Sequence, residues 1–194
     1  MDGGMLLVLY LICAYLVGNL LFGFIVGKMQ SGGDIRAEGS KNPGARNAGR
    51  LYGKKAFVLT FLGDAMKGAA VIIIGRLLGF STAVQLCGLL FVCIGHIKPV
   101  LFQLKGGKGI STLIGGLLAV NFWFVPIIII ISFFLFYLLY KGFTVPGLLS
   151  LLVCAVALFF IEKEFMPGII ALLVVTIVIW AHKLHWRKFL LIKN

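Results

Sequence analysis

The sequence has 194 residues, of which 61% are hydrophobic, and its mean hydropathy is +1.09. A soluble domain of this size is typically about 45–50% apolar, so the composition excludes an ordinary soluble protein. The formal net charge is +12, from 18 Lys and Arg against 6 Asp and Glu. In so apolar a chain, this excess indicates cytosolic loops that meet anionic lipid or phosphate substrates, rather than a nucleic-acid partner.

Apolar runs of roughly membrane-spanning length, about 20 residues each, follow one another along the chain and are separated by short polar stretches. We therefore predict an all-α, polytopic membrane protein that forms a single transmembrane domain over residues 1–194. Its helices, about seven in number, are expected at residues 5–27, 56–78, 81–101, 110–121, 124–140, 143–161 and 165–181.

The apolar stretch 110–140 decides the topology, because it is too long for one ordinary crossing of a membrane. A hairpin of two short helices, turning near Asn121–Pro126, places most of the basic residues on one side of the membrane. The positive-inside rule makes that side the cytosol. We therefore predict an outside N-terminus, with loops 28–55 and 102–109 and the tail 182–194 in the cytosol.

The first cytosolic loop contains the segment GSKNPGARNAGR at residues 39–50, which combines glycine, amide and basic side chains. Glycine lets backbone N–H groups come close to an anion, and arginine offers a fork of donors that fits phosphate. The alternative is an ordinary basic loop, which would not need so many glycine and asparagine residues beside its charges. The residues expected to bind phosphate here are Gly39, Asn42, Gly44, Arg46 and Asn47.

The second loop reads KGGKG at residues 105–109 and leads into an apolar helix through Ile110, Ser111 and Thr112. Glycines and lysines before a helix N-terminus form an anion site by dipole and by charge. The segment is no Walker A loop, because GxxxxGK[ST] does not occur. A flexible turn between helices is the alternative reading. The residues expected to bind phosphate here are Lys105, Gly106, Gly107, Lys108, Gly109 and Thr112.

Ionisable residues also occur in and near the spans. Asp64 and Lys67 lie three residues apart on one face of the second span, and His96 lies near the end of the third. A charged pair inside a membrane is a candidate functional site, but it could equally brace the helices. We list these three residues as supporting ones. His182 and His185 follow the last span, and we expect a general base or phosphate ligands there, not a metal site.

Together these segments resemble the bacterial integral-membrane acyltransferases that use acyl-phosphate and glycerol-3-phosphate. The family's first motif, roughly GSGNxGATNxxR, stands here with Lys41 in place of a glycine and Arg46 in place of a threonine. FLGDAMKG and KGGKGIST match two further segments of the family. Its last motif, HxxNxxR, is matched at His182, whereas His185 stands in place of asparagine and Lys188 in place of arginine.

The resemblance implies transfer of an acyl chain from acyl-phosphate to the 1-hydroxyl of glycerol-3-phosphate, giving lysophosphatidic acid. It implies no cofactor, no metal and no nucleic-acid partner, and it places a multi-pass enzyme among the lipids of a bacterial plasma membrane, with its site facing the cytosol. The candidate catalytic residues are Ser40, Arg50, Lys108, His182 and His185. A small anion transporter, or a catalytically altered relative that binds lipid phosphates, remains as an alternative.

The predicted topology can be tested by labelling single cysteines in intact cells. A cysteine at Asn121 should react with an impermeant reagent added from outside, because the hairpin turn is expected there. A cysteine in the tail after residue 182 should react only after the membrane is opened. A tail that is labelled from outside would contradict the model of about seven spans.

Overall fold

The computed structural model describes residues 2–140 and 142–182, and every regular element in this part of the chain is a helix. By its internal contacts the chain divides into two compact units, residues 1–119 and 120–194, and the single transmembrane domain stays a prediction. The division falls at the end of the short helix that begins the 110–140 stretch. The Asn121 side chain accepts hydrogen bonds from the backbone N–H groups of Trp123 and Phe124, and this turn starts the next helix.

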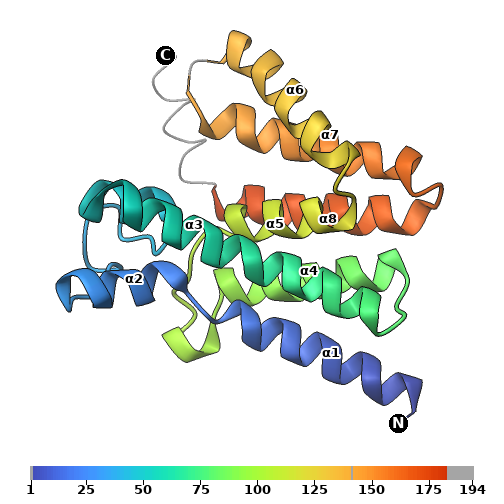
Figure 1. The fold of residues 1–194 in the computed structure, drawn as a ribbon, viewed down its shortest axis with the longest axis horizontal. Helices are drawn as coiled ribbons and strands as arrows, with labels where there is room; N and C mark the ends of the chain where they lie inside the picture. Colours follow the sequence, from blue (N-terminus) through green and yellow to red (C-terminus); the bar gives the residue numbers. More distant parts are fainter. Residues whose placement is uncertain (1, 141, 183–194) are drawn as a thin grey trace. The chain divides into compact units, whose positions relative to one another are not determined.

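The first unit holds five α-helices and one short 3₁₀-helix (Figure 1). These are α1 (Gly3–Gly18), α2 (Phe22–Ser31), α3 (Ala45–Leu77), α4 (Thr82–Ile97), η1 (Val100–Phe102) and α5 (Ile110–Val120). The second unit consists of α6 (Phe124–Leu139), α7 (Thr144–Ile161) and α8 (Phe165–Ala181), with α6 packed on α7 and α7 packed on α8.

Among the described residues, four helical segments are long and apolar enough to cross a membrane: Gly3–Ser31, Ala45–Leu77, Thr82–Phe102 and Thr144–Ile161. Three shorter apolar helices, Ile110–Val120, Phe124–Leu139 and Phe165–Ala181, accompany them. The prediction of an all-helical membrane protein is therefore confirmed. The number of crossings and the sides on which the termini lie stay predictions.

The prediction of one helix over residues 5–27 is wrong, because the chain breaks between Gly18 and Phe22 into α1 and α2. The cause lies in α3, whose Lys67 ammonium donates to the carbonyl oxygens of Gly18 at 3.2 Å and Leu20 at 2.7 Å. The carboxylate of Asp64 accepts a hydrogen bond from the backbone of Phe22, the first residue of α2. The backbone groups that lose their helical hydrogen bonds at the break thus bind side chains of α3.

The two charges match the helix ends that they contact. Lys67 lies at the C-terminal end of α1, where the helix dipole is negative, and Asp64 lies at the N-terminal end of α2, where it is positive. Their side chains form an ion pair of 2.9 Å, and both residues are buried, with exposed fractions of 4% and 1%. These contacts support the reading in which the pair braces a broken helix, one of the two readings left open by the sequence.

Small residues let the helices of the first unit approach one another closely. Any side chain at Gly68 of α3 would collide with the carbonyl oxygen of Thr112 in α5, and one at Gly115 would collide with that of Ala65. Such contacts between small residues are typical of helix packing in membranes, where backbones must come together without a hydrophobic driving force. They hold the N-terminal turn of α5 against the middle of α3.

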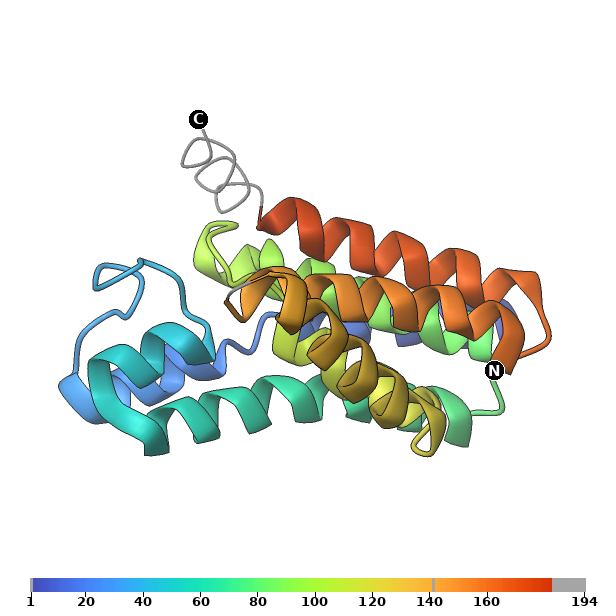
Figure 2. The same ribbon diagram turned by 90° about the horizontal axis from the view of Figure 1, so that it is seen from above.

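The loop expected over residues 28–55 is shorter than predicted, because α2 extends to Ser31 and helix begins again at Ala45. Helix α3 then turns sharply at Gly53, which has φ 84° and ψ −177°, and a short first piece folds back beside the long second piece (Figure 2). Gly49 lies against Phe57, since a Cβ at Gly49 would come within 2.9 Å of the Phe57 Cβ. The buried cluster formed by Val26, Ile35, Ala48 and Ala56 fixes this arrangement.

Replacing Lys67 by methionine should destabilise the protein, because the Asp64 carboxylate and two backbone carbonyl groups would stay buried without their partner. Removing one member of a buried ion pair typically lowers the free energy of unfolding by about 3–5 kcal/mol. Thermal unfolding in detergent measures the loss, and Lys55→Met, at an exposed lysine of the same helix, is the matched control. A Lys67→Met protein that unfolds at the parental temperature would contradict the bracing role.

Candidate active site

The first glycine-rich segment runs from the loop before α3 into its first piece. Asn47 is buried and organises this loop: its side-chain oxygen accepts from the backbone of Ser40 at 2.9 Å, and its amide nitrogen donates to the carbonyl of Glu38 at 3.1 Å. A side chain at Gly39, which has φ 56°, would come within 2.5 Å of the Asn47 oxygen. Asn47 was expected to bind phosphate. In the described part of the chain, its side chain instead makes hydrogen bonds with the backbone of the loop.

Lys41 occupies a left-handed backbone conformation, with φ 59°. This conformation raises the energy of a residue with a Cβ by about 1–2 kcal/mol, whereas glycine adopts it freely. The family motif has glycine at this position, so the backbone of this chain keeps the shape that glycine permits. Lys41 itself is exposed and carries an additional positive charge on the same loop.

The second glycine-rich segment packs tightly against the end of α4. The backbone N–H of Gly107 donates to the carbonyl of His96 at 2.9 Å, and any side chain at Gly107 would collide with Nε2 of the His96 ring. A side chain at Gly106 would likewise collide with the carbonyl oxygen of His96. Gly109, with φ 82°, then directs the chain into α5. Glycine at these positions is therefore required by close approach as well as by backbone conformation.

His96 connects the second loop to the buried ion pair. Its Nδ1 lies 2.7 Å from the Lys67 ammonium and 3.5 Å from the Asp64 carboxylate. Because an ammonium group can only donate, Nδ1 acts as the acceptor, and Nε2, on the side of Gly107, carries the proton. The three residues expected to support the site thus form one buried network, and His96 at its end packs against the loop that carries Lys108.

Lys108 of the second segment and Arg46 of the first segment lie near enough to each other to interact electrostatically. Burial lowers the pKa of the Lys108 ammonium from its ordinary value, and the nearby Arg46 guanidinium lowers that pKa further. Two cations held close together favour binding of a multiply charged anion, since the anion relieves their repulsion. The N-terminus of α5, which starts two residues after Lys108, adds the positive end of a helix dipole.

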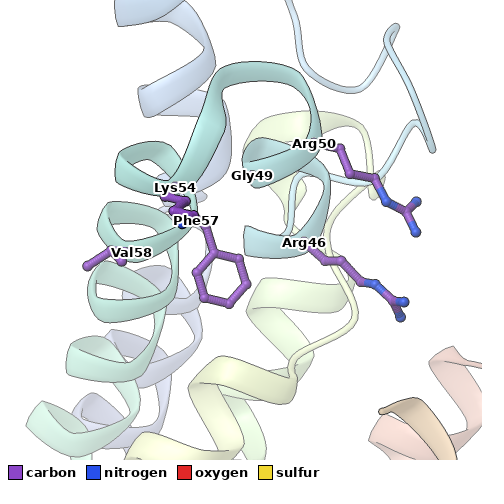
Figure 3. Close-up of a pocket in the computed structure, with 6 residues that line it drawn as sticks. All are labelled: Arg46, Gly49, Arg50, Lys54, Phe57 and Val58. Atoms are coloured by element: carbon purple, nitrogen blue, oxygen red, sulfur yellow. The ribbon is translucent and has the colours of Figure 1, made fainter. Parts of the chain in front are cut away.

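A hollow of about 540 Å³ lies between the two pieces of α3. Arg46 and Arg50 project from the short first piece, and the Phe57 ring lies in the angle between the pieces (Figure 3). In Figure 3 the guanidinium ends of both arginines point away from the Phe57 ring, so positive charge lies beside a hollow whose own surface is mostly apolar. Its complete lining is Arg46, Gly49, Arg50, Lys54, Phe57 and Val58.

Of the residues that line the hollow, Arg46 and Arg50 were predicted as site residues from the sequence, whereas Lys54, Phe57 and Val58 were not. These residues lie beyond the sharp turn at Gly53, in a stretch that was assigned partly to a loop and partly to a plain span. A glycine between two helical stretches was the available signal, because isolated glycines often mark such breaks.

Four further predicted residues lie as follows. Ser40 is exposed in the first loop, while Thr112 is buried in the first turn of α5 and its hydroxyl has no hydrogen-bond partner among the described residues. His182 ends α8 in the second unit, where its Nδ1 lies 2.8 Å from the carbonyl oxygen of Val178. His185 lies outside the described residues, so its role stays a prediction.

Comparison with known protein families gives a match over nearly the whole chain. The sequence profile of the family described as glycerol-3-phosphate acyltransferase matches residues 8–191. The chain belongs to the glycerol-3-phosphate acyltransferase family. The resemblance read from the motifs is thereby confirmed, and so is the prediction that the protein is an acyltransferase of the membrane.

Curated members of this family are similar over nearly their whole length. Glycerol-3-phosphate acyltransferase 1 of Bacillus cereus is 46% identical over 176 residues, which cover 90% of this chain and 96% of that protein. The glycerol-3-phosphate acyltransferase of Finegoldia magna is 37% identical over 189 residues, covering 95% and 92% of the two chains.

A crystal structure of the family shows the same fold. The glycerol 3-phosphate form of PlsY, an integral membrane glycerol 3-phosphate acyltransferase, superposes with a TM-score of 0.84 at 28% sequence identity. The superposition covers 95% of this chain and 92% of that one. A second crystal structure of PlsY, in its lysophosphatidic acid form, gives a TM-score of 0.83.

We expect Lys108 to bind phosphate, and a lysine attracts an anion only while it is protonated, so the alkaline limb of the pH dependence of kcat/KM should report Lys108. Replacing Arg46 by threonine, as in the family motif, removes a neighbour that lowers the pKa of Lys108. That pKa should rise, and activity should be lost at higher pH than in the parent, because kcat/KM follows the free enzyme. Lys41→Gly is the control and should leave the limb in place, whereas an unmoved limb in Arg46→Thr would contradict the coupling.

Proposed function

We propose that this chain transfers an acyl chain from acyl-phosphate to the 1-hydroxyl of glycerol-3-phosphate, at a site built from its two glycine-rich segments. The hydroxyl oxygen attacks the acyl carbon, the bond from that carbon to the phosphate oxygen breaks, and the leaving phosphate takes the hydroxyl proton. The products are lysophosphatidic acid and inorganic phosphate. The donor is already activated, so the reaction needs no acyl-enzyme intermediate.

The observation that carries this proposal is the hollow at the turn of α3. An acyl-phosphate has a charged head and an apolar chain, and the hollow offers Arg46, Arg50 and Lys54 beside Phe57 and Val58. Arginine and lysine suit the phosphate, while the apolar side chains suit the first carbons of the acyl chain. Phe57 and Val58 are also exposed, so the rest of the chain can continue among membrane lipids.

The acceptor's phosphate is assigned to the second loop. Lys108, together with the backbone N–H groups before and in the first turn of α5, forms an anion site of the helix-terminus kind. Because Lys108 lies close enough to Arg46 to perturb its pKa, this arrangement brings the two substrate phosphates together. Cations between the phosphates offset the mutual repulsion that otherwise keeps two such anions apart.

The membrane setting of the proposal follows the charge distribution. Positive charge concentrates in residues 28–55, 98–108 and the tail after residue 182, and the positive-inside rule places such segments in the cytosol. We therefore propose that the site faces the cytosol of a bacterial plasma membrane. Both water-soluble phosphate groups then stay at the surface, while the acyl chain lies among lipids.

The proposal can be tested with purified protein supplied with acyl-phosphate and glycerol-3-phosphate, followed by detection of lysophosphatidic acid. Arg50→Ala and Lys108→Ala should each lower kcat/KM about 10- to 150-fold, since a hydrogen bond between charged partners contributes roughly 1.5–3 kcal/mol. Lys55→Ala, at an exposed lysine outside the hollow, is the matched control and should stay within about twofold.

Two outcomes of this assay would count against the proposal. A parent protein that binds acyl-phosphate but forms no product would identify a catalytically altered member of the family. Full activity of Arg50→Ala or Lys108→Ala would remove that residue from the site.

A further inference from the structure

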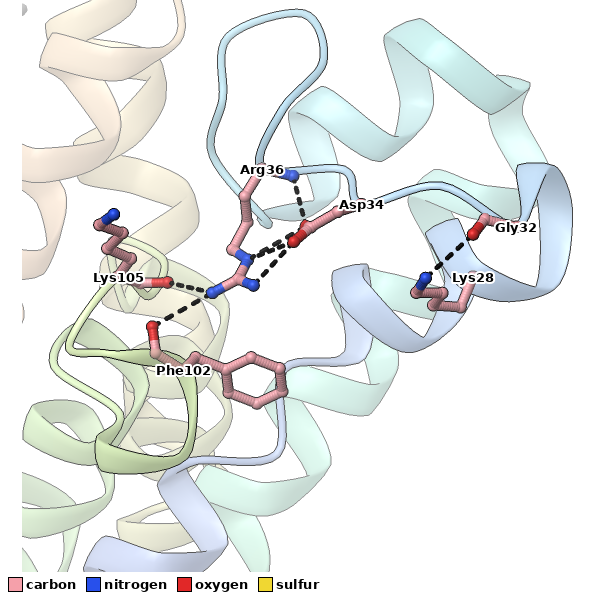
Figure 4. A network of polar contacts seen from close by, with 6 residues as sticks. All are labelled: Lys28, Gly32, Asp34, Arg36, Phe102 and Lys105. Carbon is pink, nitrogen blue, oxygen red and sulfur yellow. Dashed lines mark hydrogen bonds and ion pairs between the residues drawn. The ribbon is translucent and has the colours of Figure 1, made fainter.

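Arg36, which lies outside the two motifs, makes several contacts at once with its side chain. Its guanidinium binds both carboxylate oxygens of Asp34, with Nε 3.0 Å from Oδ1 and Nη2 2.7 Å from Oδ2 (Figure 4). Its remaining nitrogen, Nη1, donates to the carbonyl oxygen of Phe102 at 3.2 Å and to that of Lys105 at 3.4 Å. One side chain therefore bridges the first loop, η1 and the beginning of the second loop.

Aromatic rings add to this contact. The guanidinium carbon lies 5.4 Å from the ring centre of Phe24 in α2 and 5.0 Å from that of Phe102 in η1. The two rings also contact each other edge to face, with their centres 4.9 Å apart. Arginine stacks on aromatic rings through its planar, weakly hydrated guanidinium, which a lysine ammonium does not reproduce.

Asp34 orients the guanidinium rather than supplying most of the attraction. The side chains of Arg36 and Asp34 are 23% and 34% exposed, and an ion pair so close to solvent contributes little by itself. Hydrogen bonds from Arg36 hold the pKa of the Asp34 carboxyl below its ordinary value, so the carboxylate stays charged at neutral pH. Asp34 also accepts from the Arg36 backbone N–H at 2.9 Å, which fixes the start of the side chain.

The contact reaches the first motif through a short path. Asn47 donates to the carbonyls of Ile35 and Glu38, the residues on either side of the Arg36–Ala37 step, and accepts from Ser40. The backbone on both sides of Arg36 is therefore hydrogen-bonded, through the Asn47 side chain, to the backbone of Ser40. On the other side, Lys105 is the first residue of KGGKG, so Arg36 holds the place where the second motif begins.

We infer that Arg36 is a positioning residue that holds the two glycine-rich loops at the separation needed to bind both substrates. It touches no substrate phosphate itself in this assignment, since its donors are engaged with Asp34 and with two backbone carbonyls. Without it, the loops must be ordered by the ligand at the moment of binding, and apparent affinity falls accordingly. This inference rests on the proposed function for its kinetic part, and its structural part stands independently.

The structural part can be tested by measuring the distance between spin labels on cysteines placed at Ala37 and Leu101, both of which are exposed, after replacement of the native cysteines. The parent should give one narrow distance distribution, because the bridge is intact. Arg36→Leu and Arg36→Lys should both give broad distributions, since a lysine ammonium reproduces neither the paired contact with both Asp34 oxygens nor the stacking of a planar guanidinium on Phe24 and Phe102. A narrow distribution in Arg36→Lys would overturn the inference.

The kinetic part uses the same variants in the acyl-transfer assay. Arg36→Lys should raise the KM for glycerol-3-phosphate about tenfold, equivalent to about 1.4 kcal/mol, and should change kcat less. Arg76→Lys is the matched control, because Arg76 also donates to a backbone carbonyl, that of Ala119 at 2.7 Å, but lies in the last turn of α3. An equal loss of kcat in both variants, or an unchanged KM in Arg36→Lys, would contradict a positioning role.

The two readouts also separate this inference from the proposed function. A parent that forms no lysophosphatidic acid, yet shows broadening of the label distances in Arg36→Lys, would refute the proposed reaction and support the bridge. Product formation with unchanged distances in both Arg36 variants would support the reaction and refute the bridge.

Discussion

The buried ion pair between Asp64 and Lys67 is the interaction on which the rest of the first unit depends. A charge in the middle of an apolar bundle is unfavourable unless it finds polar partners, and here the partners are the two ends of a broken helix. The break and the ion pair stabilise each other. The backbone groups at the two helix ends gain charged partners, and the two buried charges gain polar partners. Because His96 joins the same network and packs on Gly107, the electrostatics of the interior also shape the second loop.

The candidate site holds several positively charged side chains near one another. In the proposed reaction two phosphate groups must come together, which requires several cations close to one another, and these cations repel each other. The loops that carry the cations are anchored by other contacts, and this anchoring opposes the repulsion. Arg36, Asn47 and the glycines packed on His96 fix the backbone, and the side chains of Arg46, Arg50 and Lys108 then project from fixed positions. Such preorganisation is the main way in which a protein stabilises charge that develops during a reaction.

Much of this could be predicted from the sequence, because the decisive patterns are local. The apolar runs define a helical membrane protein, and the glycine-rich motifs at residues 39–50 and 105–112 identify the family. Local patterns do not predict a feature that depends on a residue distant in the sequence. The stretch around Asn19 reads as continuous apolar helix, and the cause of its break, Lys67, lies far along the chain.

The turn at Gly53 and the bridge made by Arg36 escaped prediction for related reasons. Gly53 gave a visible signal, but the direction of the chain after it depends on packing of Ala48 and Ala56 in a common cluster. Arg36 looked like one more basic residue of a cytosolic loop. It acts through hydrogen bonds to the carbonyl groups of Phe102 and Lys105, and no sequence pattern predicts contacts between residues so far apart.

The broken first helix also bears on the order in which the protein is made. Gly3–Ser31 is apolar enough to enter a membrane as one segment, and it leaves the ribosome before Lys67 and Asp64 are synthesised. Until α3 arrives, the carbonyl groups of Gly18 and Leu20 have no ammonium to bind, and in lipid they are best satisfied inside an uninterrupted helix. The mature break therefore belongs to a late stage of assembly, when a long newly inserted helix is opened by the one that follows it.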